Sequence, residues 1–121
     1  MATTVLVIDD DTASRYVLAR WLGDRYRVEE ADSGTTGIEQ AIASQPDAIF
    51  LDVIMPEADG GTVAAQIQEV PVLSKVPIVF LTAIVSGKET ETKHLYGGFE
   101  FLAKPVSRDQ IIDCITKHLG P

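Results

Sequence analysis

Short apolar runs recur along the chain, and each is followed by a longer stretch with a different spacing of apolar residues. The runs cover residues 5–8, 48–51, 78–81 and 99–103, with a weaker run at residues 26–31. The first three are continuous, which is typical of strands buried on both faces of a parallel sheet. The run at 26–31 alternates between apolar and polar residues, which indicates an edge strand.

The stretches between the runs have the spacing of amphipathic helices, with apolar residues every three or four positions. The apolar residues that define the first, second and last of these helices are Val17, Leu18, Trp21, Leu22, Ile38, Ala41, Ile42, Ile111, Ile112, Ile115 and Leu119. A third helix is expected around residues 63–67, and a fourth, with a thin apolar face, at residues 88–96. Gly23 and Pro71 are expected to end the first and third helices, and Ser33 to cap the second.

Five strands that alternate with five helices predict the α/β fold class. The expected architecture is a doubly wound, five-stranded parallel sheet with strand order 2-1-3-4-5, right-handed crossovers and helices on both faces. Since the chain has only 121 residues and shows no linker or repeat, a single domain spanning residues 1–121 is expected.

Composition and charge narrow the range of functions. With 45% hydrophobic and 23% charged residues, the chain has the mix of a globular protein. Its formal net charge of −8 argues against a nucleic-acid surface, and the arginines between Arg15 and Arg27 are interpreted as a solvated helix face and a strand start. No apolar run or export signal points to a membrane, and the single cysteine, Cys114, cannot form an internal disulfide. A cytoplasmic protein with a buried, unreactive Cys114 is therefore expected.

Polar and charged residues follow four of the five predicted strands. They are Asp9, Asp10, Asp11, Asp52, Thr82 and Lys104. The carboxyl ends of parallel strands meet at one edge of the sheet, where α/β proteins bind their ligands. In the order 2-1-3-4-5 the first strand neighbours the third, so Asp9, Asp10 and Asp52 are expected to converge. Asp11 is interpreted as a helix cap rather than a ligand.

This combination of side chains indicates a specific chemistry. Three carboxylates in one crevice repel one another unless a cation lies among them, and Mg²⁺ prefers such hard oxygen ligands. Thr82 can donate a hydrogen bond, and Lys104 supplies a positive charge. Together these groups form a site for a phosphoryl group carried on a carboxylate.

With these motifs in place, the sequence resembles the receiver domains of two-component response regulators, the family that includes the chemotaxis response regulator. The resemblance covers essentially the whole chain. It rests on VLVIDD at residues 5–10, LDVIMP at 51–56 followed by Asp59-Gly60, LTA at 81–83 and FLAKP at 101–105. It implies a flavodoxin-like fold and a phosphoacceptor signalling switch rather than an enzyme.

The resemblance also implies a role for each site residue. Asp52 is expected to accept a phosphoryl group from a phosphohistidine on a sensor histidine kinase or a histidine phosphotransfer protein. Asp10 is expected to bind Mg²⁺ directly, with Asp9 helping through water, and Asp52 and the backbone carbonyl of Ile54 completing the ligands.

The remaining roles implied by the resemblance concern the response to the phosphoryl group. Thr82 is expected to hydrogen-bond to the phosphoryl group and Lys104 to pair with it. Phe101 occupies the family's aromatic switch position. Phosphorylation is then expected to alter the face formed by the fourth helix, fifth strand and fifth helix, for an output protein or domain or for dimerisation. The apolar side chains of Ile54 and Ile84 predict slow loss of the phosphoryl group, because neither can orient an attacking water.

Three other functions are alternatives to the phosphoacceptor switch. A phosphohydrolase of the haloacid dehalogenase type also uses an aspartate and Mg²⁺, but it needs an acid two residues after the nucleophile, where this chain has Ile54. A docking module that is never phosphorylated is expected to have lost an acidic residue or the lysine. A flavin-binding protein is expected to have a phosphate loop after the first strand, where three aspartates stand here. The kinase, the signal, the output and the presence of further domains stay open.

Overall fold

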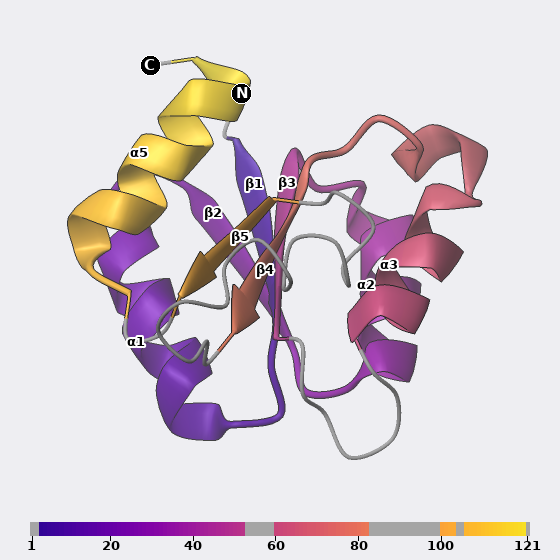
Figure 1. Ribbon diagram of the computed structural model, residues 1–121, viewed down its shortest axis with the longest axis horizontal. Helices are drawn as coiled ribbons and strands as arrows, with labels where there is room; N and C mark the ends of the chain where they lie inside the picture. The colour runs from indigo at the N-terminus through magenta and orange to yellow at the C-terminus, as the bar shows by residue number, and fades with distance from the viewer. Residues whose placement is uncertain (1–2, 53–59, 83–99, 104–105, 121) are drawn as a thin grey trace.

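The computed structural model describes residues 3–52, 60–82, 100–103 and 106–120 (Figure 1). Five strands form one sheet in the order β2-β1-β3-β4-β5, and every neighbouring pair is parallel. The strands are β1 (Thr4–Ile8), β2 (Arg27–Ala31), β3 (Ala48–Asp52), β4 (Ile78–Thr82) and β5 (Glu100–Ala103). The predicted strand order is confirmed, and the alternating run lies at the edge of the sheet as β2.

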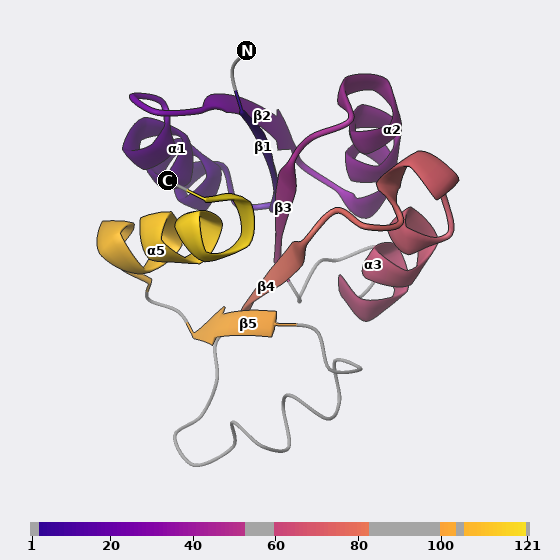
Figure 2. The ribbon, with the colours of Figure 1, turned by 90° about the horizontal axis from the view of Figure 1, so that it is seen from above.

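Helices cover both faces of the sheet. They are α1 (Thr12–Leu22), α2 (Gly34–Ser44), α3 (Gly60–Gln68) and α5 (Arg108–Leu119), with a short 3₁₀ helix η1 (Pro71–Leu73). Figure 2 shows α1 and α5 on one face and α2 and α3 on the other. The helix expected at residues 88–96 lies outside the described residues. No helix in the described ranges combines the length and the apolar character that a membrane crossing requires.

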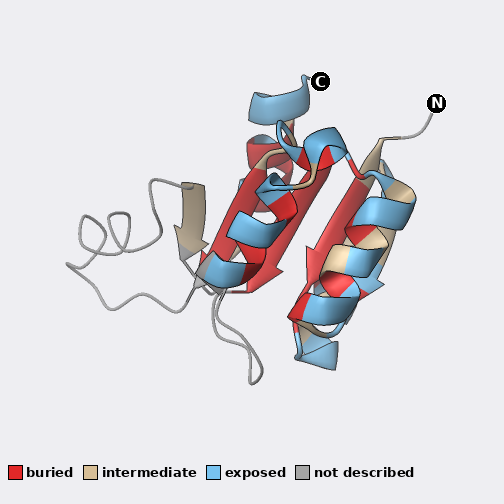
Figure 3. Ribbon diagram, turned by 90° about the vertical axis from the view of Figure 1, so that its right-hand side faces the viewer, coloured by how far each residue is buried: buried red, intermediate tan, exposed pale blue. Residues whose placement is uncertain are grey.

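The sheet separates two apolar clusters, because successive side chains of a strand point to opposite faces. In β1, Val5 and Val7 pack toward α1 and α5, while Leu6 and Ile8 pack toward α2 and α3. Figure 3 shows the central strands buried and the outer sides of the helices exposed. Cys114 is buried in the cluster beneath α1 and α5, as expected. The fold is therefore held by two cores, and both depend on the central strands.

The helix caps follow the sequence closely. The Asp11 carboxylate caps α1 by accepting the Ser14 backbone N–H at 3.2 Å, and Ser33 forms a reciprocal capping box with Thr36 at the start of α2. Both predicted caps are confirmed. The third helix ends at Gln68, before Pro71, and that proline begins η1 instead.

Three apolar residues assigned to buried helix faces are exposed. Val17 is 41% exposed, Ile42 46% and Leu119 37%. Val17 and Ile42 each lie about 100° around the helix from a buried neighbour, Leu18 and Ala41, while Leu119 is the last residue of α5. In α2 the inward side carries Gly37 and Ala41, which allow close packing: a Cβ on Gly37 would lie 2.6 Å from Ile8 Cδ1. Ile42 is thereby turned toward solvent.

Candidate functional site

Three carboxylates meet at the carboxyl edge of the sheet, as the sequence predicts. Asp52 is the last residue of β3, and Asp9 directly follows β1. The Asp9 backbone N–H donates to the Ala31 carbonyl at 3.0 Å and so continues the pairing with β2. Since Ile8 is in register with Leu51, Asp9 and Asp52 occupy adjacent positions on neighbouring strands. Together with Asp10, they offer carboxylate oxygens that all lie within 4.8 Å of one another.

The three carboxylates differ in exposure. Asp9 is fully buried, Asp52 is 8% exposed, and Asp10 faces solvent. One oxygen of Asp9 accepts the Asp11 backbone N–H at 2.9 Å, which fixes the orientation of the Asp9 carboxylate. Two buried carboxylates, of which Asp9 is held by this hydrogen bond, and one exposed carboxylate form a site that is open on one side. Hard oxygen donors in this arrangement can hold a divalent cation such as Mg²⁺ while leaving positions for water and a phosphoryl oxygen.

Arg15 is a member of this site that the sequence analysis missed. Its Nη1 donates to the Asp9 backbone carbonyl at 2.6 Å, and its Nε lies 3.4 Å from a Glu30 carboxylate oxygen. The side chain is only 15% exposed, so its assignment to a solvated helix face is wrong. The sequence does contain a feature that indicates this contact. Helical side chains lean toward the helix N-terminus, and Arg15 lies one turn after the Asp11 cap. The guanidinium therefore reaches back to the strand end that carries Asp9.

The remaining predicted site residues are described in part. Thr82 ends β4, one residue beyond the partner of Asp52 in the register, so its backbone lies at the same edge of the sheet. Phe101 lies in β5 opposite Phe80 and packs, half-buried, against the cluster beneath α2 and α3. Ile54 and Lys104 lie outside the described residues.

Sequence comparison agrees with this geometry. Residues 5–116 match the family described as response regulator receiver domain. Response regulator PleD of Caulobacter vibrioides is 35% identical over 108 residues, which cover 88% of this chain and 24% of that protein. Response regulator MprA of Mycobacterium ulcerans is 35% identical over 113 residues, covering 93% of this chain and 48% of that protein. The chain thus spans about a quarter to a half of the length of these relatives.

Solved structures show the same architecture. Chemotaxis protein CheY4 of Vibrio cholerae superposes with a TM-score of 0.88 at 25% identity, covering 98% of this chain and all of that chain. The receiver domain of the sensor histidine kinase PA1611 of Pseudomonas aeruginosa has a TM-score of 0.87 at 25% identity, with complete coverage of both chains. That structure has a magnesium ion coordinated in its active-site cleft. The predicted flavodoxin-like fold is confirmed.

Proposed function

Since this chain belongs to the response regulator receiver domain family, a family of phosphoacceptor modules in two-component signalling rather than enzymes, we propose that Asp52 is its phosphoacceptor. One observation carries the choice of residue. Asp52 ends the central strand β3, between the strand that leads into Asp9 and Asp10 and the strand that ends in Thr82. Of the three carboxylates, only that of Asp52 lies between the aspartates that follow β1 and the hydroxyl-bearing Thr82 that ends β4.

The other two carboxylates are suited to a different task. Asp9 is fully buried and already accepts the Asp11 N–H, while Asp10 is exposed beside it. We assign Asp9, Asp10, Asp52 and the backbone carbonyl of Ile54 to Mg²⁺ binding. The close set of oxygen donors from the three aspartates supports their part of this assignment. A bound Mg²⁺ supplies neutralisation of the charge on the transferred phosphoryl oxygens. Arg15 holds the Asp9 backbone and thereby keeps that ligand in place.

In the proposed transfer, an Asp52 carboxylate oxygen attacks the phosphorus of a phosphohistidine on a sensor kinase or phosphotransfer protein. The new P–O bond forms as the P–N bond breaks, and the imidazole nitrogen keeps the bonding pair. Thr82 donates a hydrogen bond to the phosphoryl group, and Lys104 pairs with its charge. The proposed phosphodonor is therefore a protein, and the net charge of −8 disfavours nucleic acid as a partner of this chain.

In the proposed response to phosphorylation, the conformational change reaches the partner-binding face through β5. Phe101 lies opposite Phe80 on β4, two residues before the β4 end that carries Thr82. A movement of Thr82 toward the phosphoryl group opens space along β4, and the ring of Phe101 turns into it. The face that includes β5 and α5 then changes for an output protein or domain.

Phosphorylation can be tested with a small acyl-phosphate donor and Mg²⁺, followed by intact-mass spectrometry. The wild-type chain is expected to gain one phosphoryl group, and chelation of Mg²⁺ is expected to prevent the gain. Asp52→Asn should abolish it, while the matched variant Asp24→Asn, which changes an exposed aspartate after α1, should not. Undiminished labelling of Asp52→Asn would contradict the assignment.

A further inference from the structure

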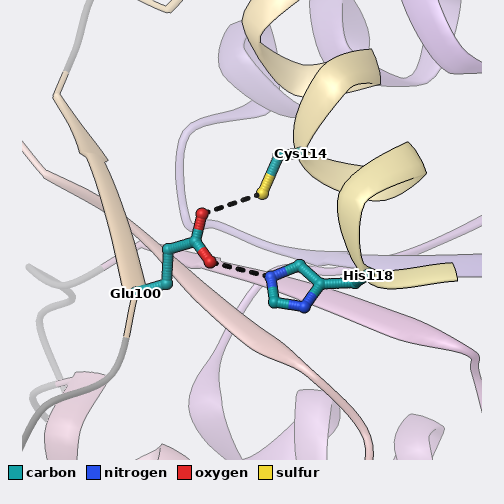
Figure 4. A group of neighbouring side chains, drawn as sticks. All are labelled: Glu100, Cys114 and His118. Carbon is teal, nitrogen blue, oxygen red and sulfur yellow. Dashed lines mark hydrogen bonds and ion pairs between the residues drawn. The ribbon is translucent and has the colours of Figure 1, made fainter.

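A second group of potential ligands lies at the opposite end of the sheet from the carboxylate site. Glu100 is the first residue of β5, and Cys114 and His118 lie on α5, which packs over that strand (Figure 4). Cys114 and His118 are four residues apart, so they share one helix face. Both side chains point toward the Glu100 carboxylate, one to each oxygen.

The distances within this group are short. His118 Nε2 lies 2.8 Å from one Glu100 oxygen, and Cys114 Sγ lies 3.6 Å from the other. One ligand atom from each of the three residues lies within 4.8 Å of the others. In a tetrahedral zinc site, bonds of about 2.0–2.3 Å place the ligand atoms about 3.3–3.8 Å apart. Small side-chain adjustments therefore suffice to admit an ion between them.

We propose that Glu100, Cys114 and His118 form a binding site for Zn²⁺ that joins β5 to the last turns of α5. Thiolate, imidazole and carboxylate are the three side-chain ligands that zinc accepts, and a set with sulfur and nitrogen selects zinc over Mg²⁺. The carboxylate site at the other end of the sheet offers only oxygen. The two sites therefore differ in metal preference as well as in position.

The group is accessible to an ion and to water. Glu100 and His118 line a cavity of about 750 Å³, together with residues from the amino ends of β3 and β4 such as Asp47 and Ile78. Water from this cavity can occupy the fourth position of a tetrahedral site. An ion can enter from this cavity at Glu100 and His118, while the buried Cys114 lies behind them.

Lys117 competes with a bound ion for the Glu100 carboxylate. Its Nζ lies 3.3 Å from the same Glu100 oxygen that His118 contacts, although its side chain is 67% exposed and can turn away. Without a metal, burial raises the pKa of Cys114 to about 12, with the charge of Glu100 adding to the effect. An ion must displace this thiol proton into solvent and part Lys117 from Glu100. Removing the charge of Lys117 should therefore strengthen zinc binding.

Cobalt provides the direct probe, because Co²⁺ occupies zinc sites and its thiolate complexes absorb in the near ultraviolet. The reduced chain, kept in excess Mg²⁺ to fill the carboxylate site, is titrated with Co²⁺ and then with Zn²⁺. One equivalent of Co²⁺ should give the thiolate band, and one equivalent of Zn²⁺ should remove it. Bound Zn²⁺ should also raise the thermal unfolding midpoint, since it binds only the folded arrangement.

Variants identify the ligands. Cys114→Ala should abolish the thiolate band, and His118→Gln, on the exposed end of α5, should weaken Zn²⁺ binding at least about tenfold. Lys117→Gln is the matched control beside His118 and should bind Zn²⁺ at least as tightly as the wild type. A Co²⁺ complex without a thiolate band, unchanged Zn²⁺ affinity in His118→Gln, or no binding by the wild type would overturn the proposal. Circular dichroism of each variant verifies its fold.

Discussion

Asp10→Asn should change the stability of the chain in opposite directions with and without Mg²⁺. Asp10 is the exposed member of a cluster whose three carboxylates lie within 4.8 Å, and its two neighbours are buried. Without a cation, the folded state holds all three negative charges close together, whereas in the unfolded chain only the sequence neighbours Asp9 and Asp10 stay close. Replacing Asp10 by its neutral isostere removes two of the three repulsive pairs while preserving the side-chain volume.

The expected size follows from the distances. Two unit charges 4.8 Å apart repel by about 1 kcal/mol in a water-like dielectric and by about 3.5 kcal/mol at an effective dielectric of ~20. The lower figure is the better guide, because Asp10 is exposed and salt screens its charge. The metal-free variant should therefore be more stable than the wild type by about 1–2 kcal/mol. For a domain of this size, that corresponds to a rise of roughly 4–8 °C in Tm.

Magnesium should reverse this order. A ligand at about one hundred times its Kd stabilises the folded state by about 2.7 kcal/mol, and Asp10→Asn removes a proposed ligand and so most of this gain. Urea unfolding, followed by the fluorescence of the half-buried Trp21, measures both states in chelator and in Mg²⁺. Asp24→Asn serves as the control, and its stability relative to the wild type should be the same in chelator and in Mg²⁺. An Asp10→Asn chain that is destabilised in chelator would contradict charge repulsion in the cluster, and one that gains as much stability from Mg²⁺ as the wild type would contradict the role of Asp10 as a ligand.

Three further predictions concern packing and ionisation. Gly37→Ala should lower the urea midpoint, because overpacking against Ile8, 2.6 Å from the new Cβ, costs about 1–3 kcal/mol and outweighs a helix-propensity gain of about 1 kcal/mol. A second substitution, Ile8→Val, should recover part of the lost stability. A Gly37→Ala chain that is more stable than the wild type would contradict this close packing. In chelator at neutral pH, Cys114 should react with a thiol reagent about 10³-fold more slowly in the folded than in the urea-unfolded chain, because its pKa is raised to about 12; equal rates would contradict its burial. Burial alone would raise the pKa of Glu100, but the hydrogen bonds from His118 and Lys117 lower this pKa below its ordinary value of 4.5. The ionised Glu100 carboxylate therefore contributes fully to stability above pH 4.5, and this contribution is lost as the pH falls through the lowered pKa. Glu100→Gln should therefore flatten the stability profile below about pH 4.5, and an unchanged profile would speak against these contacts.

The sequence was sufficient to predict the features that depend on local pattern and sheet topology. Continuous and alternating apolar runs distinguished the inner strands from the edge strand β2, and the strand order brought Asp9 and Asp52 together. Those residues follow strands directly, so their position at the carboxyl edge needs no knowledge of side-chain packing. The caps at Asp11 and Ser33 depend on a few neighbouring residues and were equally predictable.

Features that depend on how helices pack on the sheet were not predicted. The exposure of Ile42 follows from the close contact made by Gly37, and a hydrophobic pattern does not record the space that a missing side chain provides. The contact of Arg15 with Asp9 requires the position of α1 relative to β1. Glu100 and His118 are 18 residues apart and meet only because α5 returns over β5. Each of these depends on distances between elements rather than on local periodicity.

Locating the acyl phosphate in the phosphorylated chain tests most directly whether Asp52 is the phosphoacceptor. Borohydride reduces an aspartyl phosphate to an alcohol, and peptide mapping then identifies the residue that changed. The modification is expected to form only when Mg²⁺ is present and to fall on Asp52 and on neither Asp9 nor Asp10. Reduction at either of those two residues, or at any position outside the carboxylate cluster, would contradict it.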